Sequence, residues 1–161
     1  MNPSLTMHPA TYDVSSILLV EDDPDDGALF TECLGSIHPA CRLQWLSRCE
    51  PVMEALDRNP PDLVFLDINL PGADGFECLK SIFDHPRHRY MPVVMYSSSP
   101  NPRDIYISYG LGATLYLQKP SSYRGIEEAL KSILSMAWFT PGAVTAQHYV
   151  DGRYVAYGKN N

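Results

Sequence analysis

Four short runs of consecutive apolar residues constrain the fold of this chain more than any other feature of its 161 residues. The runs cover residues 17–20, 63–66, 93–96 and 115–117. Each run is too short for a typical helix, and each lacks the alternation of apolar and polar residues that marks a half-exposed strand. Strands without this alternation are covered on both faces, which is typical of a parallel sheet. The sequence therefore predicts a buried parallel sheet.

Apolar residues at helical spacing lie between these runs, together with a weaker strand pattern at residues 41–46. Asn101 before Pro102 is typical of a helix N-cap followed by proline at the first helical position. The predicted helical stretches lie near residues 30–37, 52–56, 76–83, 102–111 and 126–137. A strand followed by a helix, repeated five times, indicates an open α/β sheet with helices on both faces. Periodicity does not give the order of the strands.

The charge balance of the chain limits what it can bind. Lys and Arg number 12 and Asp and Glu number 19, so the formal net charge is −7 at pH 7. Nonspecific affinity for nucleic acid comes from cationic side chains that release counterions, so we expect no direct binding to DNA or RNA. No run approaches the ~18 apolar residues of a membrane helix, and the amino-terminal stretch lacks a basic cluster followed by an apolar core. We therefore expect a cytoplasmic protein without a membrane partner.

Both ends of the chain fall outside the α/β pattern. Residues 1–15 contain two prolines and no periodicity, so we expect a flexible leader before a domain at residues 16–138. In the tail at residues 139–161, Asp151-Gly152 is flanked by strand-forming residues, which is a β-hairpin signal. An isolated hairpin is marginally stable in water, so it should dock on the domain or on a partner, or fray. Because this tail is short, we expect no separate output domain in it.

Polar residues stand directly after the four apolar runs. The segments are Glu21-Asp22-Asp23, Asp67-Ile68-Asn69, Ser97-Ser98-Ser99 and Lys119-Pro120. The carboxyl ends of parallel strands share one edge, so folding gathers these side chains into one crevice. Two carboxylates about 4 Å apart repel by roughly 4 kcal/mol at an effective dielectric constant of 20, so the cluster needs a compensating cation. Oxygen ligands at an accessible site favour Mg²⁺.

Several motifs of this chain together resemble response-regulator receiver domains. They are residues 17–23, residues 62–72 with Asp74-Gly75, residues 92–97, and Gly112-Ala113 through Tyr116 to Lys119-Pro120. The resemblance covers about residues 16–138, and it is specific because separate motifs recur in order at the expected intervals. It implies a flavodoxin-like, doubly wound sheet with strand order 2-1-3-4-5. Residues 100–119 also look like single-domain regulators found with bacterial phytochrome-type kinases.

The resemblance implies a site for a metal ion and a phosphoryl group. Asp67 would be the phosphoacceptor and a ligand of Mg²⁺, and Asp22 would ligate the ion directly. Glu21 would hold the ion mainly through water, and Asn69 would offer its backbone carbonyl. The acid pair could instead be Asp22 and Asp23 if the first strand ends one residue later. We favour Glu21 and Asp22 because they directly follow the first apolar run.

The resemblance also implies roles for four further residues, two of which would contact the phosphoryl group. Ser97 would hydrogen-bond one phosphoryl oxygen, and Lys119 would pair with another. Pro120, expected in cis, would shape the turn after Lys119. Tyr116 would be the switch aromatic, which moves inward as Ser97 moves toward the phosphoryl group.

The resemblance implies a two-component response regulator that catalyses its own aspartyl phosphorylation and dephosphorylation and has no other enzymatic activity. The phosphoryl donor would be a histidine kinase or a histidine phosphotransfer protein. Output would follow from docking through the surface of the fourth helix, fifth strand and fifth helix. We expect this surface to include Tyr106, Tyr109 and Tyr116, and we expect a homodimer to form through it.

Two other functions fit parts of the same pattern. A phosphatase with an aspartyl-phosphate intermediate has a similar nucleophile but usually carries a second Asp two residues later as a general acid. Position 69 is Asn, which cannot donate an acid proton, so steady turnover is disfavoured. The second alternative is a degenerate receiver that acts as an unphosphorylated scaffold, and the full set of site residues argues against it.

Overall fold

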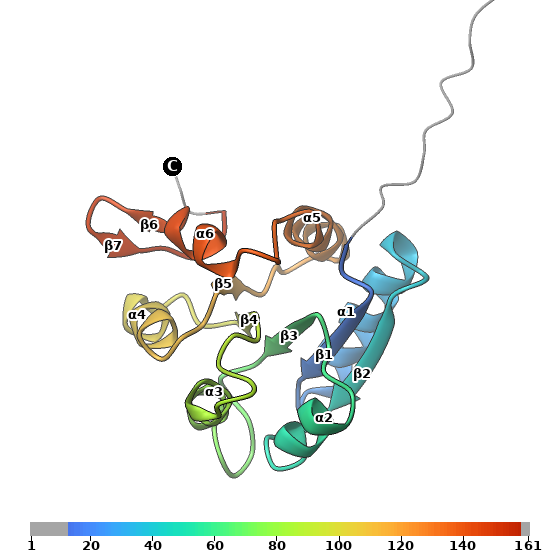
Figure 1. The fold of residues 1–161 in the computed structure, drawn as a ribbon. Coiled ribbons are helices and arrows are strands. Elements are labelled where there is room, and N and C mark those ends of the chain that lie inside the picture. Colours follow the sequence, from blue (N-terminus) through green and yellow to red (C-terminus); the bar gives the residue numbers. More distant parts are fainter. Residues whose placement is uncertain (1–12, 159–161) are drawn as a thin grey trace, which may run out of the picture.

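A five-stranded parallel sheet is the centre of the computed structural model, which describes residues 13–158. The strands are β1 (Ser16–Val20), β2 (Arg42–Leu46), β3 (Leu63–Leu66), β4 (Val93–Ser97) and β5 (Leu115–Gln118). They lie in the order β2-β1-β3-β4-β5, and every neighbouring pair is parallel (Figure 1). The predicted α/β class and the flavodoxin-like strand order are therefore confirmed.

Helices cover both faces of this sheet (Figure 1). They are α1 (Pro24–Ile37), α2 (Val52–Arg58), α3 (Gly75–Asp84), α4 (Pro102–Gly110) and α5 (Tyr123–Leu134), and a short α6 (Pro141–Ala146) follows. Ile17 and Leu19 of β1 pack with α1 and α5, whereas Leu18 and Val20 pack with α2, α3 and α4. Both faces of β1, β3, β4 and β5 are therefore buried, as the unbroken runs predict, whereas β2 at the edge of the sheet exposes Arg42, Gln44 and Trp45. Among residues 13–158, no helix has the length and apolarity to cross a membrane.

Side chains at the carboxyl edge of the sheet start two of the helices. Asp23 accepts hydrogen bonds from the backbone N–H groups of Asp25 at 2.8 Å and Asp26 at 3.1 Å, and so caps α1. The Asn101 side chain accepts from the backbone N–H of Arg103 at 3.0 Å and caps α4, which confirms the predicted N-cap. These caps fix the loops that carry the polar residues after β1 and β4.

Helix α5 ends earlier than the sequence predicts. The apolar stripe extends to Ala137, but the helix stops at Leu134. In a continuing helix, the Ile133 carbonyl would accept the backbone N–H four residues later. Here it accepts the N–H of Met136, three residues later, at 3.0 Å. The buried indole N–H of Trp138 also donates to this carbonyl, at 2.7 Å, and the chain turns toward α6.

The segment before β1 is part of the packed unit. Val14 is buried against the layer of α1 and α5. Ser15 and Ser16 donate four hydrogen bonds, from their backbone N–H groups and their hydroxyls, to one carboxylate oxygen of Asp62 at 2.8–3.3 Å. These bonds tie the start of β1 to the start of β3. Of the leader predicted at residues 1–15, residues 1–12 lie outside the described residues.

Residues 139–158, which we call the C-terminal segment, pack against β5 (Figure 1). After α6, strands β6 (Tyr149–Val150) and β7 (Arg153–Tyr154) form an antiparallel hairpin. Asp151 and Gly152 make its turn, with φ angles of 49° and 80°, and two positive φ angles are what a type I′ turn requires. The backbone N–H of Tyr157 donates to the Tyr116 carbonyl at 2.8 Å, so the hairpin is docked on this domain. Residues 159–161 of the predicted tail lie outside the described residues.

The docked segment changes the surface that the sequence suggests for partner binding. Tyr109 and Tyr116 are buried, so the prediction that they lie on the surface is wrong. Only Tyr106 of the three named tyrosines is exposed, at 70%. The physical reason is that β5 is an edge strand with apolar residues on both faces, and the C-terminal segment covers the edge that no sixth strand covers.

The Asp62 contacts predict a pH-dependent stability. Burial tends to raise the pKa of Asp62, but the hydrogen bonds from Ser15 and Ser16 outweigh it and hold the pKa below its ordinary value. A lowered carboxyl pKa stabilises the fold above the unfolded-state pKa and loses that effect as the pH falls through the folded-state pKa. Asp62→Asn should therefore lower the free energy of unfolding by about 1 kcal/mol at pH 7, and the loss should shrink toward pH 3. Urea unfolding at both pH values measures this.

Asp13→Asn, which removes a neighbouring exposed carboxylate, is the matched control and should change the free energy of unfolding by less than about 0.5 kcal/mol. A loss for Asp62→Asn that is equal at pH 7 and pH 3 would contradict the electrostatic origin of the effect.

Candidate functional site

Three carboxylates meet where β1 and β3 end. Val20 and Leu66, the last residues of these neighbouring strands, are paired in register, so the following Glu21 and Asp67 lie side by side. Carboxylate oxygens of Glu21, Asp22 and Asp67 all lie within 4.8 Å of one another. Glu21 and Asp67 are buried, whereas Asp22 is exposed. The cluster is therefore anchored in the core and open to solvent on one side.

The ammonium of Lys119 lies between the buried carboxylates of Glu21 and Asp67 and the half-exposed carboxylate of Asp26. Its Nζ is 2.6 Å from Glu21 Oε2, 2.8 Å from Asp26 Oδ2 and 3.0 Å from Asp67 Oδ2. It also lies 5.2 Å from the centre of the buried Tyr96 ring, which favours a cation. Burial tends to lower the pKa of Lys119, but the hydrogen bonds and charges of the three carboxylates outweigh it and raise the pKa above its ordinary value. Lys119 is therefore a permanent cation in the site.

Glu21 is the least compensated member of the cluster. Burial raises the pKa of Glu21 to about 7, the charge of Asp67 adds to this rise, and Lys119 opposes it. Glu21 Oε2 is buried, and apart from its ion pair with Lys119 it has no hydrogen bond of good geometry. A buried carboxylate oxygen with spare acceptor capacity, next to two further carboxylates, is a donor set that suits a hard divalent cation. The residues present therefore fit the Mg²⁺ ion that the sequence predicts.

Asp67 is held by the backbone around it. Its N–H donates to the Val20 carbonyl at 3.0 Å, and its Oδ1 accepts from the Asn69 N–H at 3.2 Å. The Asn69 side chain is exposed. These bonds aim the Asp67 carboxylate at Lys119 and leave Asn69 at the rim of the crevice.

Ser97 and Tyr116 lie on the next two strands and meet through the loop after β4. The Ser97 hydroxyl is buried and accepts the Ser99 N–H at 3.2 Å. The Tyr116 ring is wholly buried, and its hydroxyl donates to the Ser99 carbonyl at 2.8 Å. The ring of Tyr116, the predicted switch aromatic, thus points inward in this structure.

The expected cis bond before Pro120 is wrong, because no peptide bond among the described residues is cis. The trans form of a bond before proline is the more stable one by about 0.5–1 kcal/mol. On the other side of Lys119, its N–H donates to the Ser97 carbonyl at 2.8 Å and so extends the pairing of β5 with β4.

The two alternatives for the acid pair occupy different places. Asp23 is exposed, and its carboxylate caps α1 instead of joining the cluster of Glu21, Asp22 and Asp67. Sequence reasoning missed Asp26, which the first turn of α1 brings to Lys119. It also missed Trp45, whose indole N–H donates to the Glu21 carbonyl at 2.8 Å and so braces the loop after β1. The acidic residues in the first turn of α1 could have indicated Asp26 as a site residue, whereas no sequence pattern indicated Trp45.

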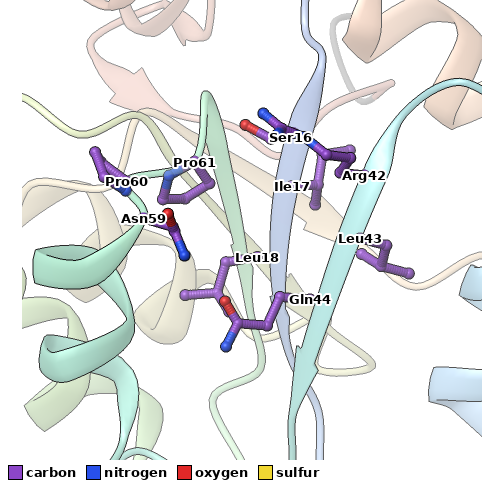
Figure 2. Close-up of a pocket in the computed structure, with 9 residues that line it drawn as sticks. All are labelled: Ser16, Ile17, Leu18, Arg42, Leu43, Gln44, Asn59, Pro60 and Pro61. Carbon is purple, nitrogen blue, oxygen red and sulfur yellow. The ribbon is translucent and has the colours of Figure 1, made fainter.

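A separate hollow of about 330 Å³ lies near the amino ends of β1 and β2 (Figure 2). Its lining residues come from β1 and β2, among them Ser16 and Arg42, and from the loop before β3, among them Asn59 and Pro60 (Figure 2). Strands β1 and β3 carry Glu21 and Asp67 at their other ends. None of the carboxylates of the cluster, nor Lys119, lines this hollow, so it is not part of the site.

A family model covers most of the described chain. The model of the response regulator receiver domain matches residues 17–131, a range that includes the carboxylate cluster, Ser97 and Lys119. The chain belongs to the response regulator receiver domain family. The resemblance predicted from the motifs is therefore confirmed. The matched range of the receiver domain stops before the C-terminal segment.

Curated relatives of this receiver domain include proteins of two lengths. Transcriptional regulatory protein GltR of Pseudomonas aeruginosa is 35% identical over 125 residues, which are 78% of this chain and 51% of GltR. The chain thus spans about half the length of that relative. Response regulator Rcp1 of Synechocystis sp. is 33% identical over 126 residues, which are 74% of this chain and 86% of Rcp1.

Solved structures of receiver proteins share the fold. The crystal structure of the Mn(2+)-bound form of response regulator Rcp1 has a TM-score of 0.69 at 30% identity and covers 76% of this chain and 96% of that one. The crystal structure of the phosphorylated cyanobacterial phytochrome response regulator RcpA has a TM-score of 0.69 at 31% identity, with 74% and 91% covered. The receiver domain described here is thus similar to single-domain regulators over most of their length.

The loop that carries Asp67 predicts an intolerance to a side chain at Gly75. A Cβ added there would lie 2.0 Å from the Asp67 carbonyl oxygen and 2.6 Å from Ile68 Cα. Because both contacts are to backbone, Gly75→Ala should lower the free energy of unfolding by about 3 kcal/mol. Gly35→Ala is the matched control: a Cβ there meets nothing within 4 Å, so this change inside α1 should raise stability by about 0.5–1 kcal/mol. Urea unfolding measures both, and equal stability of the two variants would contradict the prediction.

Proposed function

We propose that this receiver domain is a phosphorylation-controlled switch of a two-component system, with Asp67 as its phosphoacceptor. The donor would be a histidine kinase or a histidine phosphotransfer protein. The observation that carries the proposal is the carboxylate of Asp67, buried among acidic groups and paired with Lys119 at 3.0 Å. Burial of an unpaired carboxylate costs free energy. A group of buried carboxylates beside a lysine is therefore typical of a functional site, here one that would accept and stabilise a phosphoryl group.

The chemistry is a transfer of one phosphoryl group. An oxygen of the Asp67 carboxylate attacks phosphorus, the bond from phosphorus to the donor nitrogen breaks, and an acyl phosphate remains on Asp67. Such a transfer needs in-line positioning and neutralisation of the equatorial phosphoryl oxygens. Lys119 would supply a positive charge to one oxygen, and Ser97 would donate its hydroxyl proton to another. Both residues stand at the ends of β4 and β5, which are next to each other in the sheet and continue it from β3.

We propose Mg²⁺ as the cofactor. Asp22 and Asp67 would ligate it directly, Glu21 would hold it mainly through water, and the Asn69 carbonyl would complete the protein ligands. The clustered carboxylate oxygens and the spare acceptor capacity of Glu21 support this choice. The related Rcp1 has been solved in an Mn(2+)-bound form, which supports a divalent cation at the equivalent acidic site. When bound, the cation would offset the negative charge shared by the carboxylates and the phosphoryl group.

Output would come from phosphorylation-dependent docking, with a homodimer formed through the surface of α4, β5 and α5. Because the C-terminal segment covers β5, a second copy would meet the exposed side chains around it. Tyr106 on α4 and Tyr149 on β6 are 70% and 53% exposed. Exposed aromatic side chains are enriched in protein interfaces, which supports this surface.

Phosphorylation of Asp67 is directly testable. Incubation with acetyl phosphate and Mg²⁺ should add the mass of one phosphoryl group to the wild-type chain, as read by intact mass spectrometry. Asp67→Asn removes the attacking oxygen's charge and should abolish the uptake. Asp23→Asn is the matched control, because it removes a nearby charge while Asn still caps α1, and it should label at the wild-type rate. Uptake by Asp67→Asn at the wild-type rate would refute the proposal.

The same assay tests the cofactor. A chelator should stop the uptake, and Asp22→Asn should slow it by about tenfold or more, which corresponds to ~1.4 kcal/mol of activation free energy. Undiminished labelling in the presence of the chelator would exclude Mg²⁺ from the reaction.

The homodimer predicts a change in sedimentation. The wild-type chain should sediment as a dimer when saturated with beryllofluoride, a stable analogue of the phosphoryl group. Tyr106→Glu should shift it to a monomer, because it places a charge in the contact. Tyr90→Glu, at another exposed tyrosine that is 83% accessible and lies before β4, should leave the dimer intact. A wild-type monomer with and without the analogue would rule the dimer out.

A further inference from the structure

The C-terminal segment closes the open edge of the sheet at β5. Besides the bond from Tyr157 to the Tyr116 carbonyl, the Thr145 hydroxyl donates to the Thr114 carbonyl at 2.9 Å. Val144 and Ala156 of the segment are both buried, but in different layers of the core. Val144 packs in the layer of α1 and α5, whereas Ala156 packs in the layer of α2, α3 and α4. The segment therefore wraps around the edge of the sheet and joins both layers.

Tyr109 of α4 makes a second connection between the segment and β5. Its hydroxyl donates to the Val155 carbonyl at 3.1 Å and accepts the Tyr116 N–H at 3.1 Å. Its ring stacks on Tyr154 of β7, with 4.6 Å between the ring centres. A single buried hydroxyl thus holds α4, β5 and the C-terminal segment together.

Tyr116 connects this edge to the candidate site. Its backbone is bonded to Tyr109 and Tyr157, and its hydroxyl reaches the loop after β4 through the Ser99 carbonyl. Ser99 continues this connection to Ser97, because the Ser99 N–H donates to the Ser97 hydroxyl oxygen at 3.2 Å. Because the Ser97 oxygen already accepts the Ser99 N–H, its own proton can be donated to another acceptor. An inward Tyr116 therefore belongs to the arrangement in which Ser97 can serve a phosphoryl oxygen.

An outward movement of Tyr116 requires the edge to open. The ring has no exposed surface, and residues of α4 and the C-terminal segment pack in the same layer around it. Rotation of the ring away from Ser99 would have to displace that cover. The docked segment and the inward ring are therefore two parts of one conformational state.

We propose that the C-terminal segment is an intrachain clamp that holds Tyr116 inward, so that docking of the segment and phosphorylation of Asp67 stabilise each other. The inference rests on the proposed function, because it takes Asp67 as the phosphoacceptor. It extends that function by assigning a regulatory role to residues that lie beyond the range matched by the receiver model. The clamp is reversible, because its strands have two residues each and such a hairpin is marginal by itself.

Hydrogen exchange of the 161-residue chain tests the coupling. Saturation with beryllofluoride and Mg²⁺ should slow amide exchange in peptides from residues 141–158 by about fivefold or more, the usual range for coupled sites. Asp67→Asn should show no such slowing. Exchange in this segment that is unchanged or faster with the bound analogue would overturn the clamp.

A variant that undocks the segment tests the reciprocal effect. Ala156→Asp places a carboxylate at a position that is 2% exposed and should release the segment, whereas Ala146→Asp alters an exposed alanine of the same segment and is its matched control. Because coupling between binding events is reciprocal, Ala156→Asp should weaken beryllofluoride binding by the same factor by which the analogue slows exchange in the wild type. Calorimetric titration gives both affinities, and equal affinities for Ala156→Asp and the wild type would overturn the proposal.

A milder variant guards against misfolding of Ala156→Asp. Tyr109→Phe keeps the ring stack on Tyr154 and removes only the bridging hydroxyl. It should speed exchange in the segment about fivefold without the analogue, and Tyr106→Phe on the same helix should not. Wild-type exchange in Tyr109→Phe would remove the proposed link. Uptake of a phosphoryl group by Asp67 is measured separately. If the exchange experiments contradict the clamp, the proposed function still stands. If Asp67 takes up no phosphoryl group, both proposals are wrong.

Discussion

The structure depends on placing three carboxylates around one buried ammonium. At 2.6–3.0 Å, each pair of Lys119 with Glu21, Asp26 or Asp67 attracts by roughly 6 kcal/mol at an effective dielectric constant of 20, and repulsion among the carboxylates offsets part of this. Three negative charges against one positive charge leave an excess of negative charge, and the charge of Asp67 adds to the rise that burial causes in the pKa of Glu21. The excess gives this edge of the sheet an affinity for cations. Among the described residues, no second group of three carboxylate, histidine or cysteine side chains lies close enough to hold a metal ion. The pairing of β1 beside β3 is what brings Glu21 and Asp67 together.

The two edges of the sheet are protected by different means. On β2, polar side chains such as Arg42 and Gln44 face solvent, and polar or charged residues discourage pairing with another chain. On β5, Leu115, Tyr116 and Leu117 are all buried, so polar side chains cannot protect that edge. The C-terminal segment covers it with one backbone hydrogen bond, from Tyr157 to Tyr116, and with apolar contacts on both sides. The edge nearest to Ser97 and Lys119 is thus closed by a part of the chain that can open, rather than by a fixed strand.

The sequence predicted what depends on local pattern and on topology. The unbroken apolar runs gave the strands, Asn101 gave the start of α4, and the shared edge of parallel strands predicted that Glu21, Asp67 and Lys119 would meet. It could not predict features set by single contacts between distant residues. The Asp26 carboxylate bonds Lys119, which lies 93 positions away, and the Trp45 indole bonds the Glu21 carbonyl, which lies 24 positions away. The docking of the hairpin depends on bonds between Tyr157 and Tyr116 and between Tyr109 and Val155, more than 40 positions apart, which no local periodicity records.

The energies involved explain why a clamp would be useful to such a switch. Shifting a two-state surface from 1% to 99% active requires about 5.5 kcal/mol of differential stabilisation. Charge-assisted hydrogen bonds from Lys119 and Ser97 to a phosphoryl group would supply about 1.5–3 kcal/mol each, so together they barely reach that value. If Tyr116 were free to rotate outward, part of this energy would be needed to order it. A docked C-terminal segment orders Tyr116 in advance, so more of the energy of the phosphoryl contacts remains to change the surface that a partner binds.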